Sequence, residues 1–167
     1  FHSRRHHGRV SLLPQDSRLP LHSGVEELLY FYGRLQGLSG PDARHSVAEV
    51  LAWTHLEERR RSPIRTLSHG MMRRLTIAQA FLGHPELVLL DEPLSGLDPR
   101  EVVRIRELIR QRRGRQTIIL SSHNLHELEA VCDTVAFVEA GRLLRQDTLA
   151  AMMRSHHRIT YVLQPGP

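Results

Sequence analysis

The sequence has 167 residues, of which 40% are hydrophobic and 25% charged, and its formal net charge is +5. This length and composition are typical of a globular protein with a sizeable core and argue against a disordered chain. No apolar run approaches the length of a membrane span, and a single cysteine excludes an intramolecular disulfide framework. The arginine-rich start lacks the apolar segment of a secretory signal, so we expect a cytoplasmic protein.

The strongly basic residues are all arginines, since the sequence contains no lysine. Base-stacking aromatic residues are not interleaved with the arginine clusters, which favours solvated helix faces over a nucleic-acid surface. The 12 histidines include the pair His156-His157, but no cysteine or carboxylate completes a metal-ligand set at the usual spacing. We therefore expect neither a nucleic acid nor a histidine-bound metal as a ligand.

In chain order, residues 9–13 form the first predicted strand, which Pro14 stops. Three predicted helices follow, and each has a recognisable start signal. The signals are a capping box at Ser23 and Glu26, Pro41 at the start of a helix that runs to Trp53, and Ser68 ahead of a helix over 71–82. The section between the first two strands is therefore expected to be entirely helical.

Residues 87–90 are four apolar residues between turn formers, a pattern typical of a strand buried on both faces. This strand ends in two adjacent carboxylates, Asp91 and Glu92. Carboxylates at the carboxyl end of a buried parallel strand face the crevice where α/β proteins bind ligands. Since desolvated carboxylates need a partner, we expect a metal, a basic group or a reacting water there. The alternative is a strand that merely stops at a charged surface turn.

After the two carboxylates, predicted strands and helices alternate. They are a helix over 99–109 capped by Asp98, a strand over 117–121, a helix over 125–131, a hairpin of 134–138 with 142–144, and a helix capped by Asp147 or Thr148. Repeated strand-helix units predict an α/β fold with a parallel sheet and right-handed crossovers. The tail beyond these elements includes a strand-like run over 159–163.

Five short motifs, taken together in this order, resemble those of the ATP-binding cassette (ABC) ATPases. They are Gln15, Leu67-Ser68-His69-Gly70-Met71, the acid pair, Ser95-Gly96-Leu97-Asp98 and His123. The resemblance runs from about Val10 to Leu149. It implies a P-loop NTPase-like parallel sheet with an inserted α-helical subdomain. The implied division is 1–15 for the end of the first part of the core, 16–83 for the helical subdomain, 84–150 for the second half of the core, and 151–167 for a tail.

The resemblance also implies catalytic roles around ATP and Mg²⁺. Asp91 matches the Walker B aspartate that holds Mg²⁺, and Glu92 matches the residue that polarises the attacking water. His123 matches the switch histidine that contacts the γ-phosphate. Gln15 matches the Q-loop glutamine that reaches the metal and the water. Hydrolysis of a γ-phosphate needs these contributions, because the metal neutralises charge and the water must be positioned.

Three further residues are implied to act on the nucleotide of a second ATP-binding subunit. Ser68 and Gly70 match the serine and the second glycine of the family's Leu-Ser-Gly-Gly-Gln signature, which binds the γ-phosphate held by the other subunit. Here His69 replaces a glycine and Met71 replaces the glutamine, as in bacterial exporters of drugs and lipids. Asp98 matches the D-loop residue that contacts the opposite subunit.

The family's phosphate-binding loop, G-x-x-x-x-G-K-[ST], does not occur in this sequence. We expect the chain to be a fragment that begins after that loop, with a natural truncation to a pseudo-enzyme as the alternative. In either case, the 167 residues alone are expected to bind ATP poorly and to be inactive.

The resemblance implies an ATP-hydrolysing subunit of an ABC exporter, peripheral on the inner face of the cell membrane and bound to a transmembrane permease. Leu19, Leu21, Phe31 and Tyr32 are the candidate contact surface for the permease, although the same residues could simply pack the helical subdomain. The alternative functions are a non-transport ABC ATPase acting on ribosomes, DNA repair or chromosomes, and a catalytically dead structural fragment.

Overall fold

The structure, a computed structural model, describes residues 8–155, with the side chains of residues 125, 126 and 153–155 left out. The chain divides into two compact units, and the boundary in the sequence falls between His123 and Asn124. Each unit is described by itself below. The predicted boundaries at 15/16, 83/84 and 150/151 remain predictions, and the strand-like run over 159–163 lies outside the described residues.

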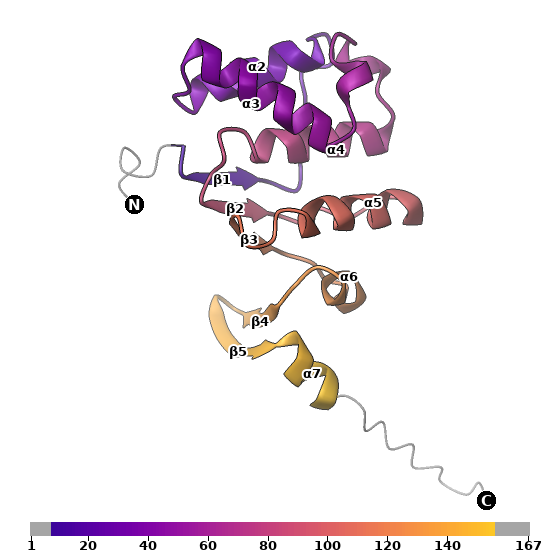
Figure 1. The fold of residues 1–167 in the computed structure, drawn as a ribbon. Coiled ribbons are helices and arrows are strands. Elements are labelled where there is room, and N and C mark those ends of the chain that lie inside the picture. The colour runs from indigo at the N-terminus through magenta and orange to yellow at the C-terminus, as the bar shows by residue number, and fades with distance from the viewer. Residues whose placement is uncertain (1–7, 156–167) are drawn as a thin grey trace, which may run out of the picture. The chain divides into compact units, whose positions relative to one another are not determined.

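Over residues 8–123, the first unit contains three parallel strands and four α-helices (Figure 1). Its elements are β1 (Val10–Leu13), α2 (Val25–Leu35), α3 (Gly40–Trp53), the single 3-10 turns η1 (Glu57–Arg59) and η2 (Ile64–Thr66), α4 (His69–Ala80), β2 (Leu87–Leu90), α5 (Pro99–Arg110) and β3 (Thr117–Leu120). The strand order is β1-β2-β3, so β2 is central. The predicted α/β fold and the helical section between the first two strands are confirmed.

The two faces of the sheet are covered to different degrees. On one face, Leu13 and Leu90 pair in register and are both 2% exposed. On the other face, Leu12, Leu89 and Ile119 form one row across the strands, and the two outer residues are 59% and 56% exposed. The prediction that β2 is buried on both faces is therefore wrong for the second face. Four apolar residues in a row predict a strand, but they do not reveal whether the described chain covers each side of it.

The helices of the first unit share a core of their own. Figure 1 shows α4 lying between the sheet and the pair formed by α2 and α3. The side chains at this centre are at most 1% exposed, and they include Leu29, Leu51, Leu75 and Ile77. Buried apolar side chains of the three helices thus pack against one another and the sheet, whereas Phe31 and Leu35 of α2 are 55% and 56% exposed.

The start of α2 differs from the prediction by one residue. The N-cap is Gly24, and the Oε2 atom of Glu27 accepts a hydrogen bond from its backbone N–H at 3.2 Å. Ser23 instead pairs with a distant segment of the same chain: its carbonyl accepts a hydrogen bond from the backbone N–H of Ile64 at 3.0 Å. Glu26 is consequently free of the capping role and pairs with Arg60.

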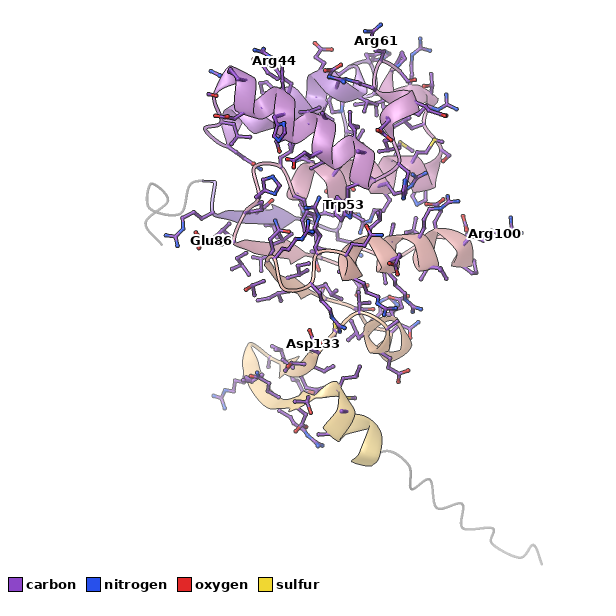
Figure 2. The ribbon with its side chains drawn as sticks, in the orientation of Figure 1. Arg44, Trp53, Arg61, Glu86, Arg100 and Asp133 are labelled. Atoms are coloured by element: carbon purple, nitrogen blue, oxygen red, sulfur yellow. The ribbon has the colours of Figure 1, made fainter. Side chains whose placement is uncertain are left out.

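An arginine and two aromatic rings join α3 and the end of α4 to α5. The Arg112 guanidinium lies 4.2 Å from the centre of the Trp53 ring, which contacts Phe81 edge to face at 4.7 Å. The indole Nε1–H of Trp53 donates to the Leu108 carbonyl at 3.2 Å, and Figure 2 labels Trp53 at this junction. Burial lowers the pKa of Arg112 below its ordinary value, although the guanidinium stays charged at neutral pH.

The second unit contains α6 (Leu125–Glu129), an antiparallel hairpin of β4 (Thr134–Glu139) and β5 (Arg142–Thr148), and α7 (Leu149–Ser155). The predicted hairpin around Ala140-Gly141 is confirmed, and both turn residues have positive φ angles of 46° and 74°. Thr148 is the cap of α7, since its Oγ1 accepts from the Ala151 N–H at 3.2 Å. None of the described helices in either unit is long and apolar enough to span a bilayer.

Candidate functional site

Asp91 and Glu92 directly follow β2, the central strand, at its carboxyl end. The backbone N–H of Asp91 donates to the Leu13 carbonyl at 2.9 Å, which continues the pairing with β1. On the other side, the N–H of Ser121 donates to the Leu90 carbonyl at 3.0 Å. The carboxyl ends of all three strands are therefore held level, and the residues that follow them meet at one edge of the sheet.

Ser121 bridges the two acidic residues. Its hydroxyl donates to Oδ1 of Asp91 at 2.6 Å and accepts from the backbone N–H of Glu92 at 2.8 Å. One hydroxyl group therefore orients the Asp91 carboxylate and fixes the backbone of Glu92. The sequence pattern predicts Ser121 only as the end of a strand. A polar residue at the carboxyl end of the strand next to the acid pair is the signal that would have identified it.

Glu92 and His123 form a second contact of the same cluster. The Nδ1 atom of His123 lies 2.9 Å from Oε1 of Glu92, and the His123 backbone N–H donates to the same oxygen at 3.1 Å. Glu92 has a φ angle of 46°, a left-handed conformation that costs free energy for a residue other than glycine. Its side chain is 16% exposed, and Oε2 is buried without a hydrogen-bond partner among the described residues. A carboxylate oxygen in this state can accept a hydrogen bond or a proton from a water molecule.

Arg73 of α4 holds the turn that carries the acid pair. Its Nε–H donates to the Pro93 carbonyl at 2.9 Å, and its Nη2 donates to the Glu92 carbonyl at 2.5 Å. Burial lowers the pKa of Arg73, while the carboxylates of Asp91 and Glu92 oppose that effect. The helix that follows Ser68 is thereby tied to the acid turn. The arginine-rich sequence around Arg73 predicts a solvated side chain and does not reveal this role.

Gln15 lines a cavity of about 610 Å³ beside α4. The wall includes Arg73, His69 and Met72 from α4, and Leu19 from the segment after β1. No hydrogen bond between described residues joins the Gln15 side chain to the acid pair. The structure thus brings Gln15 near the helix that holds the acid turn, but not into contact with the carboxylates.

Ser68, Gly70 and Asp98 form a separate group at two helix starts. The Ser68 hydroxyl accepts from the Met71 N–H at 3.2 Å, and Oδ1 of Asp98 accepts from the N–H groups of Arg100 and Glu101, each at 3.0 Å. Both residues cap their helices as predicted. No described hydrogen bond links this group to the acid pair.

The oxygen donors at the edge of the sheet fit a magnesium ion. Mg²⁺ binds oxygen atoms and commonly takes only one or two protein carboxylates, with water and phosphate oxygens as its other ligands. Asp91 is exposed at the strand end, and the Ser121 hydroxyl orients its carboxylate by donating to Oδ1. Within residues 8–155, no group of three or more His, Cys, Asp or Glu side chains is placed to hold a metal ion by itself. The donor set therefore suits a cation that arrives with phosphate rather than a protein-enclosed metal.

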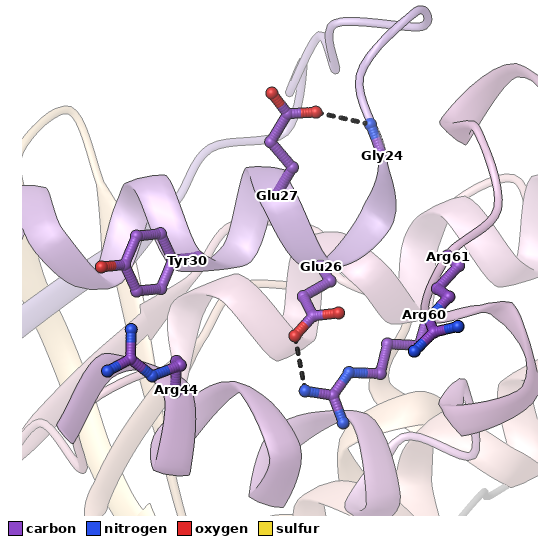
Figure 3. A pocket seen from close by; sticks show the side chains of 7 residues that line it. All are labelled: Gly24, Glu26, Glu27, Tyr30, Arg44, Arg60 and Arg61. Carbon is purple, nitrogen blue, oxygen red and sulfur yellow. Dashed lines mark hydrogen bonds and ion pairs between the residues drawn. The ribbon is translucent and has the colours of Figure 1, made fainter. Parts of the chain in front are cut away.

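A second pocket, of about 490 Å³, opens between α2, α3 and the η1 region. Figure 3 shows Glu26 pointing toward Arg60, with which it pairs at 2.5 Å, and Tyr30 lying beside Arg44. The arginine that forms the ion pair lowers the pKa of Glu26 by its hydrogen bond. The sequence does not predict this pocket, because the residues that line it come from three separate segments.

Comparisons with known proteins relate this chain to one protein family. Residues 2–95 match the sequence model of the family described as ABC transporter. The chain is 34% identical over 137 residues to the linearmycin resistance ATP-binding protein LnrL of Bacillus subtilis, covering 81% of this chain and 44% of LnrL. It is 35% identical over 146 residues to the Nod factor export ATP-binding protein I of Ralstonia nicotianae, covering 87% of this chain and 46% of that protein. The chain thus spans about half the length of the curated relatives that it matches.

Solved structures support the same assignment. The structure of cbiO1 from Clostridium perfringens, described as part of the ABC transporter complex cbiONQ, superposes with a TM-score of 0.76. It is 27% identical and covers 88% of this chain and 60% of cbiO1. A structure described as the ATP binding subunit of an ABC transporter superposes with a TM-score of 0.73 at 29% identity, over 89% of this chain and 62% of that one. The chain therefore belongs to the ABC transporter family and has the fold of its ATP-binding subunits.

Proposed function

We propose that the protein hydrolyses ATP for an ABC-type exporter and that this chain supplies the residues around the attacking water. The observation that carries the proposal is the hydrogen-bonded cluster of Asp91, Glu92, Ser121 and His123 at the carboxyl edge of the sheet. The export direction rests on the curated relatives, one of which is named for Nod factor export and another for linearmycin resistance.

Glu92 is the general base in this proposal. His123 holds Oε1 through its ring and its backbone N–H, while Oε2 is left to accept a proton from water. Partial burial keeps bulk solvent away from the carboxylate, and the contact with Ser121 fixes its backbone. A positioned general base contributes about 10² to 10⁴ in rate. In this proposal His123, whose side chain is 76% exposed, also contacts a γ-phosphate oxygen.

Asp91 and Gln15 are the residues that would hold Mg²⁺. When bound, the metal supplies charge neutralisation for the phosphate oxygens. Ser121 orients the Asp91 carboxylate for this role by donating to Oδ1. Asp91 is therefore the metal residue and Glu92 the proton acceptor, although the two are adjacent in the sequence.

Ser68, Gly70 and Asp98 act in trans, on the ATP bound by a second ATP-binding subunit. The hydroxyl of Ser68 and the N–H groups of the first turn of α4 lie at a helix N-terminus, which favours an anion. No described hydrogen bond joins these residues to the acid pair of their own chain. ATP would then bring the two subunits together, and hydrolysis would separate them.

A transmembrane permease is the second partner in the proposal, and the protein lies against the cytoplasmic face of the membrane. Leu21 and Phe31 are 49% and 55% exposed, which supports the helical segment as the docking surface. Leu19 and Tyr32 are only partly exposed, and Tyr32 contacts the Phe31 ring edge to face. The two exposed side chains are thus the better candidates for the contact.

The 167-residue chain alone is not expected to hydrolyse ATP, because its sequence lacks the G-x-x-x-x-G-K-[ST] motif.

Mixing two inactive variants of the protein expressed from its complete gene tests the proposal. One variant carries Ser68→Arg, and the other lacks the lysine of its phosphate-binding loop. If Ser68 acts in trans, the mixed dimer has one complete site and regains ATP hydrolysis, whereas each variant alone stays inactive. A verified mixed dimer without activity would contradict the proposal. A non-transport ABC ATPase would regain activity too, but it would not bind or depend on a permease.

A further inference from the structure

Gly70 packs against the side chain of Glu101, which comes from the first turn of α5. A Cβ atom at position 70 would lie 2.6 Å from Cγ and 2.7 Å from Cδ of Glu101. Real Cβ atoms do not approach other heavy atoms so closely, so no side chain fits at position 70 while Glu101 stays in place. The φ angle of Gly70 lies outside the left-handed region, so backbone conformation does not require the glycine.

Two arginines hold the Glu101 carboxylate in that position. Nη1 of Arg104 donates to Oε1 at 2.5 Å, and Nε of Arg74 lies 3.3 Å from Oε2. The side chains of Glu101 and Arg74 are only 13% and 5% exposed. Nη1 of Arg74 also donates to the Thr54 carbonyl at 2.7 Å, beyond the end of α3. The carboxylate is therefore part of a charged network in which Glu101 and Arg74 are largely buried and Arg104 is exposed.

The same residue is tied to the D-loop. The backbone N–H of Glu101 donates to Oδ1 of Asp98 at 3.0 Å, as part of the cap of α5. Gly70 follows the Ser68 cap of α4 by two residues. Glu101 therefore links the turn that carries Ser68 and Gly70 to the turn that carries Asp98. Both turns hold residues that the proposed function assigns to the partner's nucleotide.

We propose that Glu101 is a positioning residue that locks these two turns together, so that they reach the nucleotide of the partner subunit as one rigid unit. The effect of Glu101 on ATP hydrolysis rests on the proposed function. The link between the two turns rests on the contact of Glu101 with Gly70. Glu101 does not touch the nucleotide itself. It acts by fixing where Ser68, Gly70 and Asp98 stand relative to one another.

A stability comparison tests the structural part without any nucleotide. In the wild-type background, Gly70→Ala forces a clash with Glu101 and should lower the urea midpoint by about 1 M. In the Glu101→Ala background the atoms that clash are gone, and alanine is the better helix former, so Gly70→Ala should leave the midpoint unchanged or raise it. The same loss in both backgrounds would overturn the inference.

The Glu101→Ala background leaves a buried arginine without its carboxylate, which can prevent folding. Arg74→Met combined with Glu101→Ala removes the cation together with its partner and provides a second background. Gly70→Ala should again be neutral or stabilising there. A loss in this background as well would contradict the contact between Gly70 and Glu101.

Steady-state ATP hydrolysis by the protein expressed from its complete gene tests the catalytic part. Glu101→Gln keeps the shape of the side chain but weakens its contacts with both arginines, so kcat should fall roughly tenfold while KM stays near the wild-type value. Glu107→Gln, an exposed change on the same helix, is the matched control and should alter neither. An unchanged kcat for Glu101→Gln, or an equal effect of the control, would overturn the positioning role. If the wild-type protein hydrolyses no ATP, the proposed function fails, and the stability comparison still decides whether Glu101 joins the two turns.

Discussion

The helical segment and the sheet of the first unit are held together in different ways. Leu29, Leu51 and Leu75 in the helices are at most 1% exposed, whereas Leu12 and Ile119 on the outer face of the sheet are more than half exposed. The acid pair lies beyond the packed region, and hydrogen bonds from Ser121, His123 and Arg73 hold it. Stability therefore comes mainly from the helices and the inner sheet face, and the site depends on a small polar network.

Truncating one apolar side chain in the helical core and one on the outer sheet face compares the two regions directly. These variants should differ most in the free energy of unfolding. Leu75→Ala leaves a cavity in the helical core and should lower the free energy of unfolding by about 2–5 kcal/mol. Ile119→Ala on the exposed row of the sheet should change it by less than about 1 kcal/mol. Urea unfolding followed by circular dichroism measures both values. Similar losses for the two variants would show that the outer row is as well packed as the helical core.

Removing the hydroxyl of Ser121 should break the polar network while leaving the packed core intact. Ser121→Ala leaves the Glu92 N–H without its acceptor and the Asp91 carboxylate without its donor, which should cost about 1–3 kcal/mol in the free energy of unfolding. ATP hydrolysis by the protein from the complete gene should fall roughly tenfold or more, because the acid turn is no longer fixed. Thr117→Ala, at the exposed start of the same strand, is the control. Wild-type hydrolysis in Ser121→Ala would exclude the bridging role.

Local signals in the sequence were sufficient for the elements that carry the site. The apolar run over 87–90 and the caps at Ser68 and Asp98 were predicted because each depends on a few neighbouring residues. The capping box at the start of α2 was predicted one residue too early. Serine and glycine are both good caps, and the pairing of Gly24 with Pro63 from a distant segment decided between them.

The contacts that were missed all join segments far apart in the chain. Arg73 reaches the turn after β2, and Glu101 reaches Gly70 from another helix. Arginines in a basic sequence are usually solvated, so nothing in the local pattern distinguished Arg73 from its neighbours. The exposure of the outer sheet face was missed for a similar reason, since coverage depends on which segments pack there.

The ion pair on the helical surface should give the smallest effect, and its pH dependence has a defined sign. Arg60 lowers the pKa of Glu26 below the ordinary 4.5, so the pair stabilises the fold above that pH and loses its contribution as the pH falls through the lowered pKa. Both side chains are at least one-third exposed, which limits the contribution to about 1 kcal/mol or less. Glu26→Gln should thus be less stable than wild type at pH 7 and equally stable well below pH 4.5. A difference in stability that persists in acid would argue against the ion pair.

Hydrolysis by Glu92→Gln tests the central claim, that the cluster at the edge of the sheet positions Glu92 to accept a proton from water. The measurement is steady-state Mg-ATP hydrolysis by the protein expressed from its complete gene, with Mg-ATP binding followed by calorimetry. The amide keeps the volume of the side chain but does not accept the proton, so the rate should fall by about 10²- to 10⁴-fold while binding is retained. Glu107→Gln should hydrolyse ATP at the wild-type rate. Hydrolysis at that same rate by Glu92→Gln would contradict the account.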